Sequence, residues 1–171
     1  SNLLKVKDKK KRGFYLSAAR SHLFNDIVSK RIELDYFDTL SIGDVCMLAG
    51  TQSVFIAEDL DQVLLNRLID KDIDITAPMW GAGELMTQGQ TLHFEQQIAA
   101  NYSEISSGLP KFGLKQERRR IRLNLSTPSL IINETGDNKN TVTLKFFLPA
   151  GCYATTILRE LIDYKDLNLR S

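Results

Sequence analysis

Apolar side chains recur along the chain with spacings that predict both helices and strands. From Phe14 to Ile32 they return every three or four residues, which is typical of an amphipathic helix. Four more helices are expected: one after Asp59, whose carboxylate can cap it, one over Thr91–Ile105, one over Leu114–Leu123 and one after Ala154.

Four short segments have the composition and boundaries of β-strands. They are Gly43–Leu48, Ser53–Ala57, Ser129–Asn133 and Thr141–Leu148, the last two around a turn at 136–138. A short alternating stretch, Asp72–Thr76, leads into Pro78–Gly83, which breaks regular structure and is expected to form a shaped loop. Because helices and strands do not alternate regularly, the pattern favours an α+β fold over a doubly wound sheet.

Length and composition are those of a soluble globular protein. The chain has 171 residues, of which 43% are hydrophobic and 25% are charged. It can therefore form one domain, or one domain and a part of another. No apolar run approaches the roughly 20 residues needed to cross a bilayer, and no signal-peptide pattern is found. A cytoplasmic protein is expected. The chain begins without a methionine, which indicates a piece of a longer protein.

Charge is segregated along the chain, although the total is near zero. The 22 Lys and Arg residues against 21 Asp and Glu give a net charge of +1. Lys5–Arg12 and Lys111–Arg122 each hold six basic residues and one acid, which leaves a charge of −9 for the rest. Two concentrated basic segments suggest a surface for a polyanion. A solvated helix face and a disordered basic end would give the same pattern.

Metal, nucleotide-cofactor and thiol chemistry find little support in the sequence. His22 and His93 have no His or Cys at ligand spacing. The run Gly81-Ala82-Gly83 lacks the third glycine and the strand-to-helix context of a dinucleotide-binding fingerprint. Cys46 and Cys152 form no Cys-x-x-Cys pair, and buried, inert cysteines are expected. We therefore expect neither a metal nor a cofactor.

An aromatic ring is expected at a corner near the C-terminus. A strand ends at Pro149, a turn of small residues follows, and Tyr153 comes just before a helix. A ring held there can stack on a flat ligand such as a base, while Gly151 allows another backbone or a ribose to approach closely. The same ring could instead cover the edge of the core.

Five blocks of sequence, in this order along the chain, resemble the TruD family of tRNA pseudouridine synthases. They are Phe14–Asn25 (FYLSAARSHLFN), Gly43–Val45 (GDV), Pro78–Gly83 (PMWGAG), Glu117–Arg119 (ERR) and Leu148–Thr155 (LPAGCYAT). The resemblance spans almost the whole chain but only about the C-terminal half of a family member. It implies a TruD-type insertion domain of helices and short strands at 1–125, with a basic segment at 5–12. The end of the catalytic domain, a strand and a helix, is then expected at 126–171.

The resemblance implies an enzyme that isomerises uridine at position 13, in the D arm of tRNA, to pseudouridine without cofactor or metal. The family's nucleophilic aspartate stands in a Gly-x-Lys-Asp-x-x-Ala motif, which this chain does not contain. Lys7-Asp8-Lys9 lacks the preceding glycine, and Gly113-Leu114-Lys115-Gln116 has a glutamine in place of the carboxylate. We therefore expect no catalytic nucleophile here and no activity from this chain alone. The alternative is an RNA-binding module without catalysis.

The resemblance also assigns candidate binding residues. Tyr153 matches the aromatic position that lies against the target uracil, with Gly151 and Arg159 as candidate support for the active site. Arg159 could face the absent aspartate, a phosphate or surface acids. The candidates for gripping tRNA are Lys9, Lys10, Lys11, Arg12, Arg118, Arg119 and Arg120.

A consequence for the isolated chain follows from the expected domains. The strand Thr141–Leu148 and the helix after it would expose apolar faces without the rest of a catalytic domain. Such faces and strand edges tend to find partners, which predicts self-association or a disordered tail.

Overall fold

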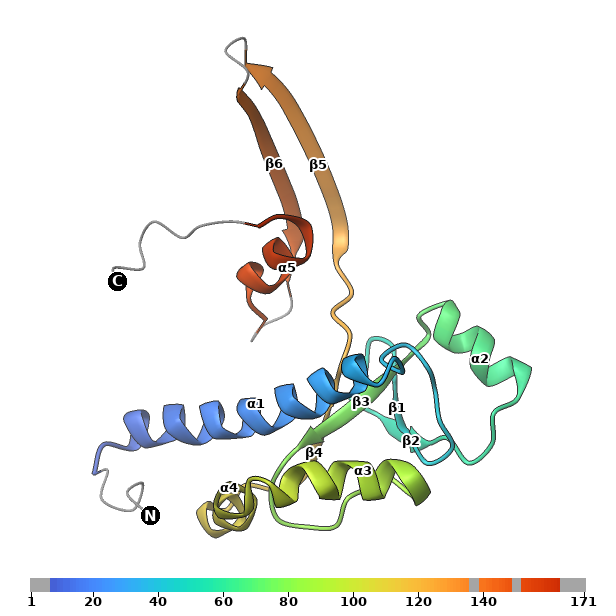
Figure 1. The fold of residues 1–171 in the computed structure, drawn as a ribbon, viewed down its shortest axis with the longest axis vertical. Coiled ribbons are helices and arrows are strands. Elements are labelled where there is room, and N and C mark those ends of the chain that lie inside the picture. The colour runs from blue at the N-terminus through green and yellow to red at the C-terminus, as the bar shows by residue number, and fades with distance from the viewer. Residues whose placement is uncertain (1–6, 136–138, 149–151, 164–171) are drawn as a thin grey trace. The chain divides into compact units, whose positions relative to one another are not determined.

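The structure is a computed structural model and describes residues 7–135, 139–148 and 152–163. Helices and antiparallel strands are mixed along the chain (Figure 1), which confirms the α+β class. Contacts divide the chain into two compact units, of which unit 1 ends at Arg122 and unit 2 begins at Leu123. Within the described residues no helix is long and apolar enough to cross a membrane.

Unit 1 combines a four-stranded antiparallel sheet with helices. The helices are α1 (Lys9–Glu33), α2 (Gln62–Ile69), α3 (Gly89–Ala100) and α4 (Ser103–Gly108), and the 3-10 helix η2 (Leu109–Phe112) follows α4. The strands are β1 (Val45–Leu48), β2 (Val54–Ile56), β3 (Ile73–Met79) and β4 (Glu117–Arg120), in the spatial order β2-β1-β3-β4. β3 is buried along its length except at Met79, so the core of unit 1 is built around it.

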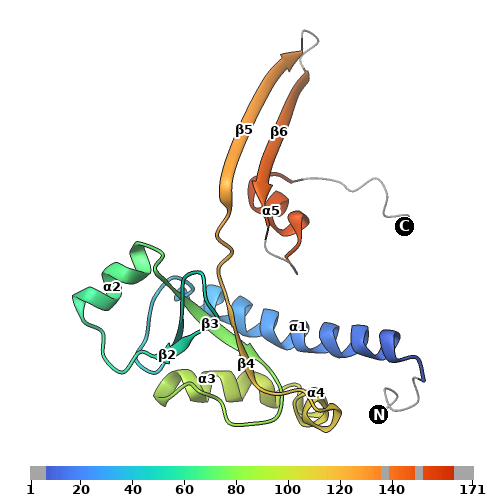
Figure 2. The same cartoon turned by 180° about the vertical axis from the view of Figure 1, so that it is seen from behind.

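Helix α1 packs on the core only through its second half. Asp8 starts the helix, because its carboxylate accepts hydrogen bonds from the backbone N–H groups of Lys10 (2.8 Å) and Lys11 (3.3 Å). The buried side chains of α1 are Leu23, Phe24, Ile27 and Arg31. Figures 1 and 2 show from opposite sides that the first half of α1 extends past the sheet.

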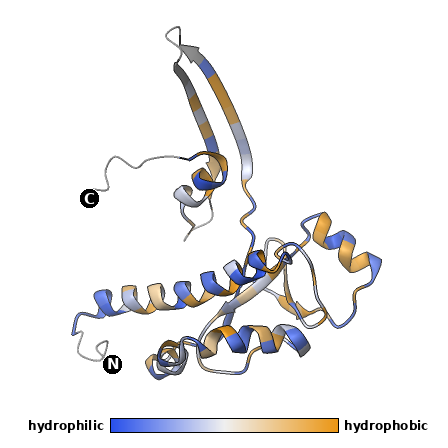
Figure 3. Ribbon diagram, viewed as in Figure 1, coloured by the Kyte–Doolittle hydropathy of each residue, from blue (hydrophilic) through white to orange (hydrophobic). Residues whose placement is uncertain are grey.

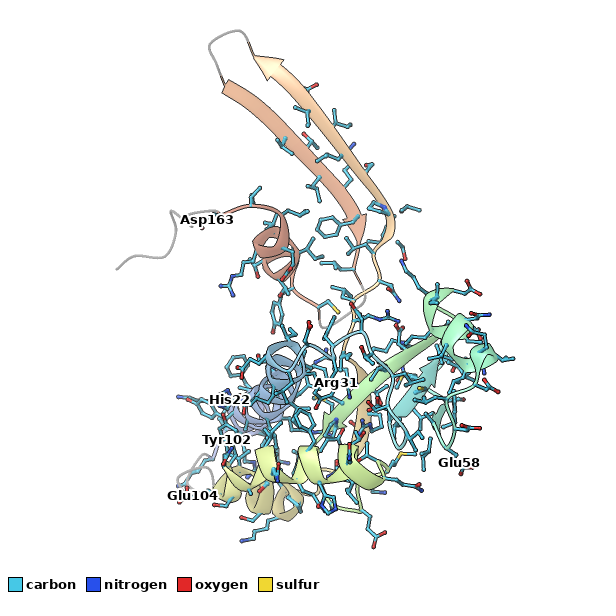
Figure 4. All side chains as sticks on the ribbon, turned by 45° about the vertical axis from the view of Figure 1, so that its right-hand side comes forward. His22, Arg31, Glu58, Tyr102, Glu104 and Asp163 are labelled. Atoms are coloured by element: carbon cyan, nitrogen blue, oxygen red, sulfur yellow. The ribbon has the colours of Figure 1, made fainter. Side chains whose placement is uncertain are left out.

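A buried ion pair joins the end of α1 to the start of β1. The Arg31 guanidinium contacts the two carboxylate oxygens of Asp44 at 2.8 and 3.1 Å, and the side chains are 2% and 0% exposed. Arg31 also donates to the Thr39 carbonyl oxygen at 3.1 Å. In Figure 4 it lies among the packed side chains of unit 1. A bidentate pair of this kind fixes the end of the helix relative to the sheet.

The predicted loop Pro78–Gly83 starts as the last two residues of β3 and then runs beside the segment that precedes β4. The Ala82 N–H donates to the carbonyl oxygen of Leu114 at 2.6 Å. An added Cβ at Gly81 would lie 2.3 Å from the carbonyl carbon and oxygen of Lys115. Only a residue without a side chain allows this backbone contact.

The predicted helix over Leu114–Leu123 is wrong, because this segment holds β4. The strand pairs antiparallel with β3, with Arg119 opposite Ala77. Gly113, in the left-handed region at φ 76°, ends η2 before it. The predicted helix over Thr91–Ile105 is divided into α3 and α4.

The other predicted helices of the chain are confirmed. α1 covers the predicted range and begins earlier, and α5 (Ala154–Leu161) begins where expected. α2 follows Asp59 as predicted, but its cap is Asp61, whose carboxylate accepts from the Leu64 N–H at 2.7 Å.

Unit 2 is a β-hairpin followed by α5. Its strands β5 (Ser126–Thr135) and β6 (Lys139–Phe147) pair antiparallel and extend the predicted strands, whereas the predicted turn 136–138 lies outside the described residues. The consecutive residues Leu130, Ile131 and Ile132 are 58%, 46% and 58% exposed. Since neighbouring side chains of a strand point to opposite faces, both faces of β5 are apolar and open. Figure 3 shows this apolar colouring along β5.

We predict opposite effects for two glycine-to-alanine substitutions in unit 1. Gly81→Ala forces a methyl group against the Lys115 backbone and lowers the free energy of unfolding by about 1–3 kcal/mol. Gly13→Ala, in α1 with nothing within 4 Å of the new Cβ, raises it by roughly 0.5–1 kcal/mol. Urea unfolding measures both. Equal midpoints for Gly81→Ala and the parent chain would contradict the close contact.

Candidate nucleic-acid interface

Arg118 of β4, a predicted RNA contact, is held inside unit 1. Its guanidinium makes two 3.0 Å contacts to the carboxylate of Glu95 on α3, and the two side chains are 3% and 1% exposed. The Nε donates to the Thr76 hydroxyl at 2.9 Å, and Nη2 donates to the Thr76 carbonyl oxygen at 2.7 Å. The Thr87 hydroxyl completes the site by donating to Glu95 at 2.8 Å. The charge and donors of Arg118 are therefore used within the protein, and its contact with RNA stays a prediction.

Arg120 and Arg122 are bound in the same way to Asp74 of β3. Arg120 Nε lies 3.3 Å from Asp74 Oδ2, and Arg122 Nη2 lies 3.0 Å from Oδ1. Arg120 also donates to the carbonyl oxygens of Leu48 (2.7 Å) and Thr51 (2.9 Å). Its side chain is 26% exposed, so most of it is withdrawn from solvent.

Arg119 faces a different neighbour from the arginines on either side of it. Its guanidinium lies 5.7 Å from the ring centroid of Phe24 on α1, within range of a cation–π contact. The four arginines of the second basic segment are therefore engaged by acids and an aromatic ring of unit 1, whereas its Lys111 and Lys115 are exposed.

The first basic segment is displayed to solvent. Lys9, Lys10 and Lys11 are exposed in the first turn of α1, and Arg12 is half-buried. No ion pair of the described residues engages these four side chains. Basic residues at a helix N-terminus lie near the positive end of the helix dipole, so the cluster costs stability unless an anion approaches it. This segment has the properties expected of a phosphate-binding surface.

Arg20 fastens three parts of unit 1 together. From α1 it donates to the carbonyl oxygens of Met79 (2.7 Å) and Lys115 (2.8 Å), and it lies 3.1 Å from the Glu117 carboxylate. Its side chain is only 11% exposed. Arg20 thus holds the end of β3 and the start of β4 against α1.

In unit 2, Tyr153 stands at the N-terminal cap of α5 and is 74% exposed. The ring is therefore accessible, whereas the predicted turn at 149–151 lies outside the described residues. Arg159 is exposed in the last turn of the same helix, and among the described residues neither side chain has an ion pair or hydrogen-bond partner. Gly151, the other predicted support residue, lies outside the described residues.

The described residues hold no group of three or more metal-ligating side chains. His22 packs edge-on against the ring of Tyr102, with centroids 5.1 Å apart, and the two are labelled in Figure 4. Burial raises the pKa of the Cys46 thiol to about 12, so this cysteine stays protonated and inert at neutral pH.

An open cavity of about 690 Å³ lies beside the start of α3, with Tyr36, Leu40, Ile42, Leu60 and Phe94 in its lining. No charged side chain lines it. It therefore offers no cation to a phosphate.

Comparison with known proteins identifies the family of this chain. The family model described as tRNA pseudouridine synthase D (TruD) matches residues 2–161. The chain belongs to the TruD family. It is 55% identical to tRNA pseudouridine synthase D of Colwellia psychrerythraea, covering 97% of this chain and 47% of the relative. The corresponding protein of Shewanella oneidensis is 48% identical, covering 95% of this chain and 42% of the relative. The chain thus spans less than half the length of these relatives.

A solved TruD structure shares the fold. The crystal structure described as tRNA pseudouridine synthase D (TruD) from Methanosarcina mazei is matched with a TM-score of 0.65 at 24% sequence identity. The match covers 82% of this chain and 36% of that chain.

Three of the five blocks that resemble the TruD family are joined through Arg20. Arg20, from the first block, binds Met79 of the third block and Glu117 of the fourth. Asp44, from the second block, pairs with Arg31. These contacts give Arg20 and Asp44 a structural role within unit 1.

The acids that hold the arginines were missed by the sequence reasoning. Glu95 and Asp74 lie 23 and 48 residues from Arg118 and Arg122. The available signal was the alternation of the arginines in steps of two, which is the period of a strand.

We predict that Arg118→Met destabilises the chain without weakening an RNA contact. The substitution leaves Glu95 buried without its charge partner, and the free energy of unfolding falls by about 3–5 kcal/mol. The double variant Arg118→Met/Glu95→Leu recovers most of this loss. Urea unfolding measures both variants. A stable Arg118→Met chain with reduced RNA affinity would show that this arginine faces the substrate.

Proposed function

We propose that this chain is part of a TruD tRNA pseudouridine synthase that isomerises uridine at position 13, in the D arm of tRNA, to pseudouridine. In this proposal unit 1 grips the RNA and unit 2 supplies one wall of the active site. The observation that carries it is the family match over residues 2–161, in a chain that displays an exposed basic segment at the start of α1.

The gripping role is assigned to Lys9, Lys10, Lys11 and Arg12. Phosphate contacts fix a protein on folded RNA without reading its sequence, and exposed lysines are suited to them. The contacts of Arg118 and Arg120 leave these arginines a structural role, so they are removed from the proposed interface.

The active-site role is assigned to Tyr153. An enzyme that rearranges a glycosidic bond takes the nucleotide out of its stack and holds the base while it is detached and rotated. A ring that is 74% exposed at the start of α5 can receive a base on its face. Arg159, exposed on the same helix, can pair with a phosphate or with a carboxylate from the rest of the enzyme. Gly151 is the proposed point of close approach.

Two features of the chain support the absence of a nucleophile. Asp8, within the motif-like run Lys7-Asp8-Lys9, uses its carboxylate to cap α1. The other motif-like run carries Gln116, which has no carboxylate. We infer that the catalytic aspartate belongs to another part of the polypeptide, that the chain alone is inactive, and that the reaction takes place in the cytoplasm without a metal or cofactor.

The open faces of unit 2 support its assignment to a larger domain. β5 exposes apolar residues on both faces, which is the pattern of a strand inside a covered sheet. We infer that residues 126–171 end the catalytic domain, that 1–125 form most of the insertion domain, and that the remaining half of the enzyme covers the hairpin.

The alternative is an RNA-binding module that acts without catalysis. It requires the same basic segment but no aspartate motif in the sequence upstream. Reading the upstream coding sequence separates the two functions, because a Gly-x-Lys-Asp motif there supports the enzyme and its absence supports the module.

We predict that the purified chain forms no pseudouridine in tRNA, and that activity appears when it is co-expressed with the N-terminal part of a TruD relative. In that assembly Tyr153→Ala lowers kcat/KM by about five- to hundredfold, the value of one stacked base, while Tyr153→Phe keeps the ring and the activity. Release of tritium from uridine labelled at C5 measures the reaction. Pseudouridine formed by the chain alone would overturn the assignment.

We predict that the chain alone self-associates through unit 2. Replacing Ile131 and Val142, which are 46% and 54% exposed, by threonine reduces the apolar area and shifts the chain towards monomer. Light scattering measures the mass in solution. The matched control is Val63→Thr on α2, 67% exposed in unit 1, which leaves the mass unchanged. A monodisperse monomer of the parent chain would contradict the prediction.

A further inference from the structure

Two aromatic rings stand beside the exposed lysines of α1. Phe14 is 71% exposed and Tyr15 is 41% exposed, and their rings meet edge-on with centroids 6.3 Å apart. Lys11 precedes them by three and four residues, and Lys10 precedes Phe14 by four. Residues at these spacings are neighbours on a helix surface. We call Lys10, Lys11, Phe14 and Tyr15 the basic-aromatic patch.

We propose that the basic-aromatic patch binds an unpaired nucleotide of the RNA, with its base stacked on Phe14 and its phosphate on Lys10 and Lys11. The inference rests on the proposed function in that it takes RNA as the partner. It adds a binding site for an unstacked base on α1, separate from Tyr153, and therefore a preference for single-stranded or looped RNA over a continuous duplex.

The direction of side chains on a helix supports this arrangement. Long side chains of a helix lean towards its N-terminus, so the Phe14 ring lies over the turn that carries Lys10 and Lys11. A base on the ring would therefore have its phosphate beside the two ammonium groups. Ser17 and Ala18, the next residues on this side, are small and exposed, and they leave the ring open.

Charge favours RNA over a protein surface as the partner of Phe14. Packing the ring against protein would also withdraw Lys10 and Lys11 from water, and no acid of the described residues pairs with them. Burying such charges without partners is costly, whereas phosphates supply the partners. In a paired helix the bases are stacked on one another, so a protruding ring finds a free base face only in unpaired RNA.

The test compares a fluorescent single-stranded oligouridine with a blunt RNA duplex of equal length, at one salt concentration, by fluorescence anisotropy. The 171-residue chain is used with Phe14→Leu, Phe14→Trp and the double variant Lys10→Ala/Lys11→Ala. The control is Ile69→Ala on α2, where the side chain is 73% exposed like that of Phe14. Because these positions are exposed, the variants keep the fold, and urea unfolding verifies this.

Phe14→Leu is expected to weaken binding of the single strand by about five- to hundredfold and to leave the duplex unchanged, while Phe14→Trp restores the single-strand affinity. Lys10→Ala/Lys11→Ala weakens both probes, and Ile69→Ala weakens neither. Equal effects of Phe14→Leu on both probes, or no effect on either, would overturn the stacking site. If the lysine variant still lost affinity for RNA in that case, the gripping role would be upheld. No effect of the lysine variant would refute that role as well. A lower unfolding midpoint or an altered mass for Phe14→Leu, without a change in RNA affinity, would identify the ring as a protein contact and overturn the inference.

Discussion

The structure of unit 1 depends on buried arginines whose charges are met inside the protein. β4 carries three consecutive arginines, and a strand of this composition can pair with the buried strand β3 only because Glu95 and Asp74 meet Arg118 and Arg120. Arg31 with Asp44, and Arg20 with the carbonyl oxygens of Met79 and Lys115, fix α1 to the same sheet. Because a buried charge without a partner is costly, each pair constrains the elements that carry it to one arrangement. The same pairs decide which positive charges remain for a ligand.

This constraint changes how the charge of the sequence relates to function. Of two segments with equal positive charge, the first is exposed at the start of α1, whereas the four arginines of the second are engaged within unit 1 and only its Lys111 and Lys115 are exposed. Arg20 and Asp44, which belong to two of the blocks that resemble the TruD family, likewise form ion pairs within unit 1. The proposed contacts to RNA then lie at two places of different chemistry: lysines with exposed rings on α1, and an exposed ring at the start of α5.

Much of the fold could be predicted from the sequence where apolar periodicity is strong. The helix from Phe14 to Ile32 was recognisable because its buried side chains recur at helical spacing, and α5 was recognisable from the apolar spacing of Ile157, Leu158 and Leu161. β4 could not be recognised by the same means, because it consists of Glu117 and three arginines, which carry no apolar signal. Their partners lie tens of residues away, and only the tertiary fold brings them together. The family could be recognised from short motifs, yet the motif arginine Arg20 proved to hold the protein's own backbone.

The central claim is that the lysines of α1, and not the arginines of β4, neutralise RNA phosphates. It is tested most directly by the salt dependence of RNA affinity. For a Lys9, Lys10 and Lys11 triple alanine variant, the account predicts that the slope of log K against log salt falls by about two to three relative to the parent chain. A control with the same net charge, in which Lys30, Lys71 and Lys145 are replaced by alanine, should keep the parent slope. Equal slopes for the α1 variant and the parent chain would contradict the account.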